Sequence, residues 1–294
     1  MFQGCFTAIV TPFRGNGVKP ELDEEAFARL VELQNEGGVA GIVAVGTTGE
    51  SPVLSHEEHR RVVELTVEHA RCSVIAGTGS NCTWEAVELS RHASDVGAEA
   101  TLQVCPYYNK PSQEGLFRHF SAIAERVDIP HILYNIPGRS ALEIAPETMA
   151  RLKEEHSNII GVKEASGKPE SWRRIRELCG EDFLILSGND GDTFALMREH
   201  AAKGVISVAS NIIPGRMQRF VELGLRGDFA AMQEEHRLLS ELFDVLFIDT
   251  NPIPIKEAMR LAGLPAGGFR LPLCETSPEK RERIRRVISK LGII

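Results

Sequence analysis

The chain has 294 residues, of which 43% are hydrophobic and 25% are charged. These values are near the average of globular proteins and exclude collagen-like and disordered classes. The 41 acidic and 33 basic residues give a net charge of −8, which argues against nucleic-acid binding through phosphate contacts. The longest apolar stretch, residues 37–46, is too short to span a membrane, and residues 1–13 carry no secretory signal pattern. We therefore expect a cytoplasmic protein without membrane partners.

Short apolar runs rich in β-branched residues recur along the chain and indicate buried strands. They cover residues 5–10, 41–45, 73–76, 101–105, 131–134, 159–162, 183–186 and 204–208. Amphipathic segments with helical period lie between them, for example around Phe27, Val62, Ala86 and Leu116. Eight alternating strand–helix units with no sign of a reversal predict an α/β fold. A closed (β/α)8 TIM barrel is favoured over a doubly wound sheet.

Capping residues mark the boundaries of the predicted helices, and the regular alternation of strands and helices ends after residue 208. Ser55 precedes Glu58 by three residues, which is the spacing of a capping box, and Ser112 begins another predicted helix. Beyond the last strand the pattern predicts helices only, over residues 214–227, 228–247, 252–262 and 277–291. We expect the first of these helices to close the barrel. Residues 1–227 would then form the catalytic barrel and residues 228–294 a C-terminal helical extension.

Lys163 is the sharpest candidate for chemistry, because the active sites of such barrels lie at the carboxyl ends of the strands. It directly follows the apolar run 159–162 and is expected to be desolvated there. Desolvation favours the neutral amine, which can attack a ketone or aldehyde carbonyl and form a Schiff base. The alternative is a structural lysine paired with Glu164 or another acid.

All three tyrosines of the chain, Tyr107, Tyr108 and Tyr134, also lie at the ends of predicted strands. Forming an imine and then an enamine moves protons, and a relay of hydroxyls from Thr47, Tyr108 and Tyr134 could carry them. A single tyrosine at a strand end is more often a packed ring with a satisfied hydroxyl. Three tyrosines facing one lysine favour the relay.

Two further features could bind the carboxylate groups of a substrate. The turn that contains Thr47 and Thr48 is flanked by glycines and offers backbone amides and hydroxyls, although a plain turn is an equal alternative. It lacks the pattern of a phosphate-binding loop. Arg139 follows a Pro-Gly turn and could grip a carboxylate with two nitrogens, or could be an ordinary surface arginine.

The remaining polar clusters indicate neither a metal nor a cofactor. His56 and His59 are three residues apart, which is not the spacing of a zinc-binding helix. A solvated first helical turn is the expected interpretation there, with a ligand contact as the alternative. Lys256 lies in a proline-rich stretch, where we expect a role at a helix start. The sequence contains no metal motif, dinucleotide fingerprint or serine-hydrolase elbow, so we expect no cofactor.

Several motifs together resemble the dihydrodipicolinate synthase (4-hydroxy-tetrahydrodipicolinate synthase) family of class I aldolase-like enzymes, over essentially the whole chain. The matching motifs are AIVTPF at 8–13, VGTTGES at 45–51, AGTG at 76–79, PYYNKP at 106–111, YNIPGR at 134–139, GVKEA at 161–165 and NPIP at 251–254. The resemblance implies a lyase that joins pyruvate to L-aspartate 4-semialdehyde through a Schiff base. Its product is 4-hydroxy-tetrahydrodipicolinate, on the route to diaminopimelate and lysine.

The resemblance also implies which residues carry the reaction. Pyruvate would form its imine with Lys163. Thr47, Tyr134 and Tyr108 would form the proton relay, with Tyr108 reaching in from a neighbouring subunit. The substrate-binding positions that match are Thr48 for the pyruvate carboxylate, Arg139 for the semialdehyde carboxylate, and Gly188 and Ile206 for the backbone lining of the pyruvate site.

An effector site and an oligomer are implied in the same way. The positions that match the family's allosteric lysine site at a dimer interface are Ser51, His56, His59, Asn81, Glu85 and Tyr107. Pro52 and Trp84 depart from the small residues expected there. A homotetramer built as a dimer of dimers and inhibited by lysine is the expected assembly.

A sister class I pyruvate aldolase on the same scaffold is the alternative function, with a 2-keto-3-deoxy sugar acid or N-acetylneuraminate as its substrate. The imine lysine suits both functions. Arg139 favours a short carboxylated aldehyde, because a sugar acid needs more hydroxyl partners. A non-enzymatic metabolite-binding protein would be expected to have lost Lys163 or the relay, and both are present in the sequence.

Overall fold

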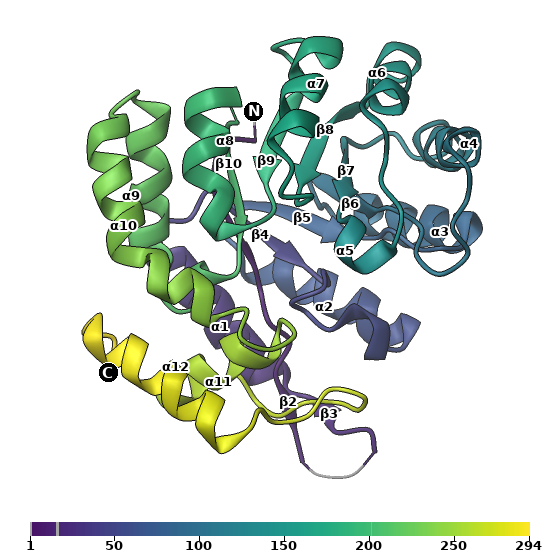
Figure 1. Ribbon diagram of the computed structural model, residues 1–294. Coiled ribbons are helices and arrows are strands. Elements are labelled where there is room, and N and C mark those ends of the chain that lie inside the picture. The colour runs from purple at the N-terminus through teal and green to yellow at the C-terminus, as the bar shows by residue number, and fades with distance from the viewer. Residues whose placement is uncertain (1, 16–17, 201) are drawn as a thin grey trace.

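The computed structural model describes residues 2–15, 18–200 and 202–294. Within these residues, eight parallel strands close into a barrel in the order β1-β10-β9-β8-β7-β6-β5-β4 (Figure 1). The strands are β1 (Gly4–Ala8), β4 (Gly41–Ala44), β5 (Ser73–Gly77), β6 (Ala100–Val104), β7 (His131–Asn135), β8 (Ile159–Glu164), β9 (Leu184–Ser187) and β10 (Gly204–Ser207). Every predicted strand is present with its ends shifted by no more than a few residues, so the predicted (β/α)8 barrel is confirmed.

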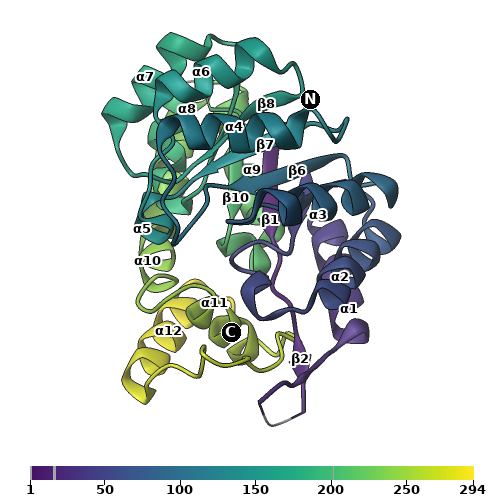
Figure 2. The ribbon, with the colours of Figure 1, turned by 90° about the vertical axis from the view of Figure 1, so that its right-hand side faces the viewer.

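Helices surround the barrel on its outside (Figures 1 and 2). They are α1 (Glu24–Gly37), α2 (His56–His69), α3 (Thr83–Asp95), α4 (Gln113–Ala124), α6 (Pro146–Glu155), α7 (Pro169–Cys179), α8 (Thr193–His200) and α9 (Pro214–Leu225). Helix α9 packs against β1 and α1 and completes the ring, as the sequence predicted. The predicted cap of α2 is also present, because Ser55 and Glu58 form both hydrogen bonds of a capping box.

Short elements escaped the sequence pattern. Strand β2 (Phe13–Arg14) pairs antiparallel with β3 (Glu21–Leu22), and α5 (Pro137–Ser140) is a single turn after β7. Three 3-10 turns follow other strands: η1 (Ser51–Val53), η2 (Asp190–Asp192) and η3 (Ala209–Asn211). Segments of two to four residues are too short to show a helical or strand period.

Two apolar layers hold the barrel together. Inside the ring, Phe6, Val43, Ile75 and Ile132 pack with other buried strand residues, and a larger layer lies between the strands and the helices. The seam between β1 and β10 is tight, because a Cβ on Gly204 would lie 1.9 Å from the carbonyl oxygen of Gly4. Only glycine fits there, so the ring can close at full strand-to-strand contact.

The C-terminal helices α10 (Phe229–Val245), α11 (Ile253–Leu261) and α12 (Pro278–Lys290) were also predicted. In both ribbon views α11 and α12 lie at the end of the barrel that carries the β2–β3 hairpin. The fully buried Lys256 of α11 donates to Glu50 at 2.6 Å and to the carbonyl oxygens of Thr11 and Gly268. Lys256 lies in the first turn of α11, at the helix start as expected, and its side chain ties this helix to the barrel.

Arg270 makes a second buried connection between this C-terminal region and the barrel. Its guanidinium donates to both carboxylate oxygens of Glu58, at 2.7 and 2.8 Å, and to the carbonyl oxygens of Pro20 and Val53. The ion pair and the hydrogen bonds hold the pKa of Glu58 down at about 2. Within the described residues, no helix is long and apolar enough to cross a membrane.

Candidate active site

Lys163 and Tyr134 stand side by side at the carboxyl ends of adjacent strands. They are register partners in the β7–β8 pair, and the Lys163 amine lies 4.1 Å from the centre of the Tyr134 ring. Lys163 is only 6% exposed. Among the described residues, no side chain or carbonyl oxygen accepts a hydrogen bond from its amine. This buried amine is therefore free of the contacts that would hold it in a purely structural role.

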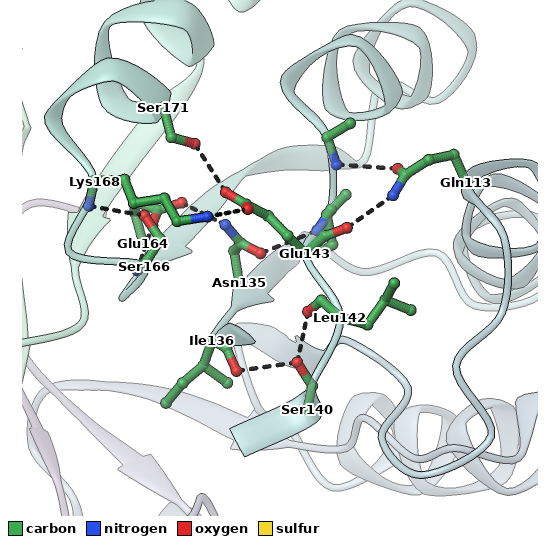
Figure 3. Close-up of polar contacts among 12 residues, drawn as sticks. Gln113, Asn135, Ile136, Ser140, Leu142, Glu143, Glu164, Ser166, Lys168 and Ser171 are labelled. Atoms are coloured by element: carbon green, nitrogen blue, oxygen red, sulfur yellow. Dashed lines mark hydrogen bonds and ion pairs between the residues drawn. The ribbon is translucent and has the colours of Figure 1, made fainter. Parts of the chain in front are cut away.

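Glu164 does not pair with Lys163, which was the structural alternative for this lysine. The Glu164 carboxylate accepts hydrogen bonds from the side-chain amide of Asn135, at 2.9 Å, and from the backbone amide of Ser166, at 2.6 Å (Figure 3). Burial raises the pKa of Glu164 despite these contacts. The acid is thus bound on the other side of the strand, away from the Lys163 amine.

The turn that contains Thr47 and Thr48 follows β4 directly and has unusual backbone geometry. Val45 and Glu50 adopt positive φ angles of 48° and 55°, which cost energy for residues with a Cβ. Contacts from outside the turn hold it in place. Thr11 donates its hydroxyl to the carbonyl oxygen of Gly49 at 2.7 Å, and Lys256 holds the carboxylate of Glu50.

Asn251 connects the threonine turn to Arg139. Its side-chain amide donates to the Thr48 hydroxyl at 2.9 Å, and its carbonyl oxygen accepts from the Arg139 guanidinium at 3.1 Å. The two residues predicted to bind substrate carboxylates are therefore joined by a single residue of the C-terminal region. The sequence showed Asn251 only as part of the NPIP motif and gave it no role.

A cavity of about 430 Å³ opens beside these residues. The residues that line its wall include Thr47, Tyr134 and Arg139, and also His56 and Glu85. Within the described part of the chain, the lining includes Tyr134 but not Lys163, whose amine lies against that ring. The cavity has room for small carboxylated molecules and offers one arginine and several hydroxyls to bind them.

The predicted effector residues also lie together, and most of them line the same cavity. His56 contacts Glu85 at 2.7 Å, and Ser80 donates a hydrogen bond to the same carboxylate. The side-chain amide of Asn81 donates to the carbonyl oxygen of Tyr107 at 3.2 Å. Ser51, His56, His59, Glu85 and Tyr107 all line the cavity.

The expected solvated first turn of α2 holds for His56 but is wrong for His59. His56 is exposed, whereas His59 is buried and contacts the carbonyl oxygen of Gly77 at 2.9 Å. Burial lowers the pKa of His59 to about 4, so this imidazole is neutral near pH 7. The two residues share a face of the helix, but His56 is the first residue of α2, whereas His59 lies one turn further along and packs against β5.

The three tyrosines do not face one lysine within this chain. Tyr134 lies beside Lys163, Tyr107 lies at the far part of the cavity, and Tyr108 is 90% exposed. Tyr108 also adopts a positive φ angle of 71° in the loop that follows β6. The expectation based on strand ends alone is therefore wrong for Tyr108, because the loop carries it out to the surface.

The last two predicted binding positions lie at the ends of β9 and β10. The Gly188 amide donates to the carbonyl oxygen of Glu164 at 2.7 Å, and Ile206 is buried in β10 with its side chain inside the barrel. Nearby, Asp190 accepts hydrogen bonds from the backbone amides of Val208 and Ala209. No group of histidine, cysteine or acidic residues in the described ranges could hold a metal ion.

A closed (β/α)8 barrel with a buried lysine beside a tyrosine at its strand ends is the arrangement of class I aldolase-type lyases, and the chain is a lyase of this class. A model of the Dihydrodipicolinate synthetase family matches residues 1–291. The chain belongs to this family.

Relatives with full-length similarity agree with this assignment. The 4-hydroxy-tetrahydrodipicolinate synthase of Methanocaldococcus jannaschii is 47% identical over 297 residues and is covered completely, as is this chain. The crystal structure of dihydrodipicolinate synthase from Aquifex aeolicus has a TM-score of 0.96 and 46% identity over 99% of each chain. The enzyme of the same name from Cyanidioschyzon merolae, solved with lysine bound, has a TM-score of 0.95 and 40% identity over 100% of this chain and 99% of that one.

Proposed function

We propose that this chain condenses pyruvate with L-aspartate 4-semialdehyde to form 4-hydroxy-tetrahydrodipicolinate, in the biosynthesis of diaminopimelate and lysine. The observation that carries the proposal is the buried Lys163 amine, which lies against the Tyr134 ring and makes no other polar contact within the described residues. The names of the full-length relatives support the same reaction. We assign residues 1–227 to the catalytic barrel and residues 228–294 to a helical extension, in a cytoplasmic enzyme.

In the first half-reaction, the Lys163 amine attacks the ketone carbon of pyruvate to give a carbinolamine. Loss of water gives the imine, and loss of a proton from the methyl carbon gives the enamine. Tyr134 and Thr47 line the cavity beside Lys163 and are the groups assigned to move these protons. The Thr48 turn holds the pyruvate carboxylate, and the backbone of Gly188, after β9, and of Ile206, in β10, lines the pyruvate site.

In the second half-reaction, the enamine carbon attacks the aldehyde carbon of the semialdehyde and forms the new carbon–carbon bond. The substrate amine then attacks the imine carbon, closes the ring and releases the Lys163 amine. Arg139 binds the semialdehyde carboxylate, and its contact with the Asn251 carbonyl oxygen orients the guanidinium for this purpose. Local cations of this kind are needed, because both substrates present a carboxylate and the chain carries a net charge of −8.

A test of this function begins with pyruvate and borohydride. Reduction should leave one reduced pyruvate adduct on Lys163, detected by peptide mass spectrometry, and the untreated enzyme should then turn over aspartate 4-semialdehyde. An unlabelled Lys163 would contradict the mechanism. Labelling without turnover of the semialdehyde would favour the sister aldolase that acts on sugar acids.

We also propose that the enzyme is a homotetramer built as a dimer of dimers, in which Tyr108 completes the relay of a partner subunit. Tyr108 is 90% exposed and Trp84 is 67% exposed, and a hydrogen bond from Asn109 to the carbonyl oxygen of Asn81 joins their loops, which supports a partner surface there. Variants Y108F and K163A should each be inactive alone. Mixed and reassociated, they should recover activity, because one site in the hybrid combines Lys163 of one chain with Tyr108 of the other. No recovery would contradict a shared site.

Lysine is the proposed effector, bound by His56, His59, Asn81, Glu85 and Tyr107 with Ser51 at the edge of the site. The Glu85 carboxylate suits the lysine amine, and the lysine-bound relative supports the idea. Initial rates should fall at millimolar lysine and recover in the variant E85Q. Unchanged rates at millimolar lysine would exclude feedback inhibition for this chain.

A further inference from the structure

Asn135 and Glu164 form a buried link directly behind the candidate site. They are the next residues along the chain after Tyr134 and Lys163, and they are register partners in the β7–β8 pair. Neither side chain is more than 1% exposed. The Asn135 amide donates to Glu164 at 2.9 Å, so the two strands are connected by their side chains at the same level as the candidate catalytic residues (Figure 3).

The link lies on the opposite side of the strands from the cavity. Successive side chains of a strand point to opposite faces, so Asn135 and Glu164 face outward where Tyr134 and Lys163 face the barrel interior. Neither Asn135 nor Glu164 lines the cavity formed by the described residues. Any role that they have in the reaction must therefore act through the residues that they hold.

The same link fixes the segment that carries Arg139. The backbone amide of Ile144 donates to the Asn135 side-chain oxygen at 3.0 Å and closes the stretch that contains Arg139. The next residue back, Glu143, is held by Lys168 at 2.7 Å and, through its carbonyl oxygen, by Gln113 at 2.8 Å. Figure 3 shows how these contacts tie the segment to the loop after β8 on one side and to α4 on the other.

The hydrogen-bond partners of Asn135 and Glu164 determine which of their atoms must donate and which must accept. The Ile144 and Ser166 backbone amides can only donate, so the Asn135 oxygen and one Glu164 oxygen must accept. The second Glu164 oxygen must then accept from the Asn135 amide. A buried donor that faces another donor costs roughly 1–3 kcal/mol. Only a carboxylate at one position with an amide at the other satisfies every group.

We propose that Asn135 and Glu164 are positioning residues of the condensation, which hold Lys163, Tyr134 and Arg139 in their relative places without touching a substrate. The proposal rests on the proposed function, since it assigns those three residues to the reaction. A misplacement of reacting groups by about 1 Å costs on the order of 100-fold in rate. Because the link contacts both strands and the segment that carries Arg139, it can prevent such a shift of Lys163 and of Arg139 at the same time.

The test exchanges the amide and the carboxylate between positions 135 and 164. Glu164→Gln sets two amide donors against each other and should lower kcat and the rate of pyruvate imine formation by about 100-fold. Asn135→Asp sets two carboxylates together and should lose rate most at high pH, where both are ionised. The double variant N135D/E164Q restores every donor–acceptor pair with the same net charge, so it should recover most of the lost rate.

Arg174→Met provides the matched control. It removes the exposed ion pair with Glu147 between α7 and α6, which takes no part in the link, and should change the rate by less than about twofold, since such pairs contribute little. Thermal unfolding and circular dichroism at the assay temperature report the folded fraction of each variant. A lowered Tm with unchanged kcat for the folded E164Q enzyme would overturn the positioning role, and so would a double variant as slow as either single one.

Failure of the proposed function gives a different pattern. The rate of imine formation needs only pyruvate and Lys163, so it tests the link even if the wild-type enzyme does not turn over the semialdehyde. Slow imine formation in E164Q and recovery in the double variant would then support the positioning role for another pyruvate lyase. No imine in the wild-type enzyme would overturn both proposals.

Discussion

Lys163 and Lys256 are both buried lysines, and the regions around them differ in one decisive way. Lys256, between α11 and the barrel, donates to the Glu50 carboxylate and to two carbonyl oxygens. Lys163, at the carboxyl end of β8, lies against the Tyr134 ring, and its amine makes no hydrogen bond or ion pair among the described residues. Burial therefore does not separate a reactive lysine from a structural one. The two lysines differ in whether the amine already donates its hydrogen bonds to protein acceptors. An ammonium group whose three protons are all held by acceptors has no free lone pair and cannot act as a nucleophile.

The largest expected effect comes from removing the nucleophile itself. The variant K163M should lose kcat by more than about 10³-fold, since no other group can form the imine. Borohydride trapping with pyruvate should leave no adduct anywhere on the chain. An adduct that moved to Lys256 would break the comparison, because it would show that the second lysine is also available for chemistry.

Loss of the other lysine should act on stability instead. Burial lowers the pKa of Lys256, and its ion pair with Glu50 is fully enclosed. K256M leaves the Glu50 carboxylate buried without its partner and should lower the free energy of unfolding by about 3–5 kcal/mol. Urea unfolding measures this loss. Folded K256M should still trap pyruvate on Lys163, and normal stability with lost trapping would contradict the distinction.

A smaller effect is expected at Arg139, which lines the same cavity as Tyr134. R139L should raise the KM for aspartate 4-semialdehyde by about 10- to 100-fold, the equivalent of one or two hydrogen bonds to a charged group. The rate of pyruvate imine formation should stay unchanged, because that step precedes the semialdehyde. Steady-state and single-turnover kinetics separate the two steps. An equal loss in both steps would mean that Arg139 supports the structure of the whole site and is not specific to the semialdehyde.

The smallest expected effect is the pH dependence of the other C-terminal ion pair. Arg270 lowers the pKa of Glu58 from 4.5 to about 2 in the folded protein. Ionised Glu58 therefore stabilises the fold above pH 4.5, and this contribution is lost as the pH falls toward 2. Comparison of the wild type with E58Q by urea unfolding should show a difference of about 1–2 kcal/mol at pH 6 that shrinks in acid. A difference that stayed constant with pH would exclude the charge as its source.

The barrel and the position of Lys163 at a strand end could be predicted from the sequence because their signals are local. Apolar runs mark the strands, and Lys163 follows one of them directly. The side-chain partners of the site are not local. Asn251 reaches Thr48 and Lys256 reaches Glu50 across more than 200 positions, and no periodic pattern encodes such pairs.

Misplaced predictions have physical causes of the same kind. His59 was expected in a solvated first helical turn, yet the packing of α2 against β5 buries it. Tyr108 was expected to face Lys163 because it follows a strand, yet within this chain it is 90% exposed and lies at the surface. Local sequence predicts which element a residue belongs to, whereas the direction of its side chain depends on neighbours that come from elsewhere in the chain.

The closure of the barrel by β1 and β10 has a consequence for the newly made chain. One edge of β1 can pair with β4 early in synthesis, but its other edge waits for β10, where Gly4 meets Gly204. Until then the growing sheet presents two open edges, which are templates for pairing with other chains. The ribosome must therefore deliver about two thirds of the protein before the last exposed backbone groups of the sheet find their partners.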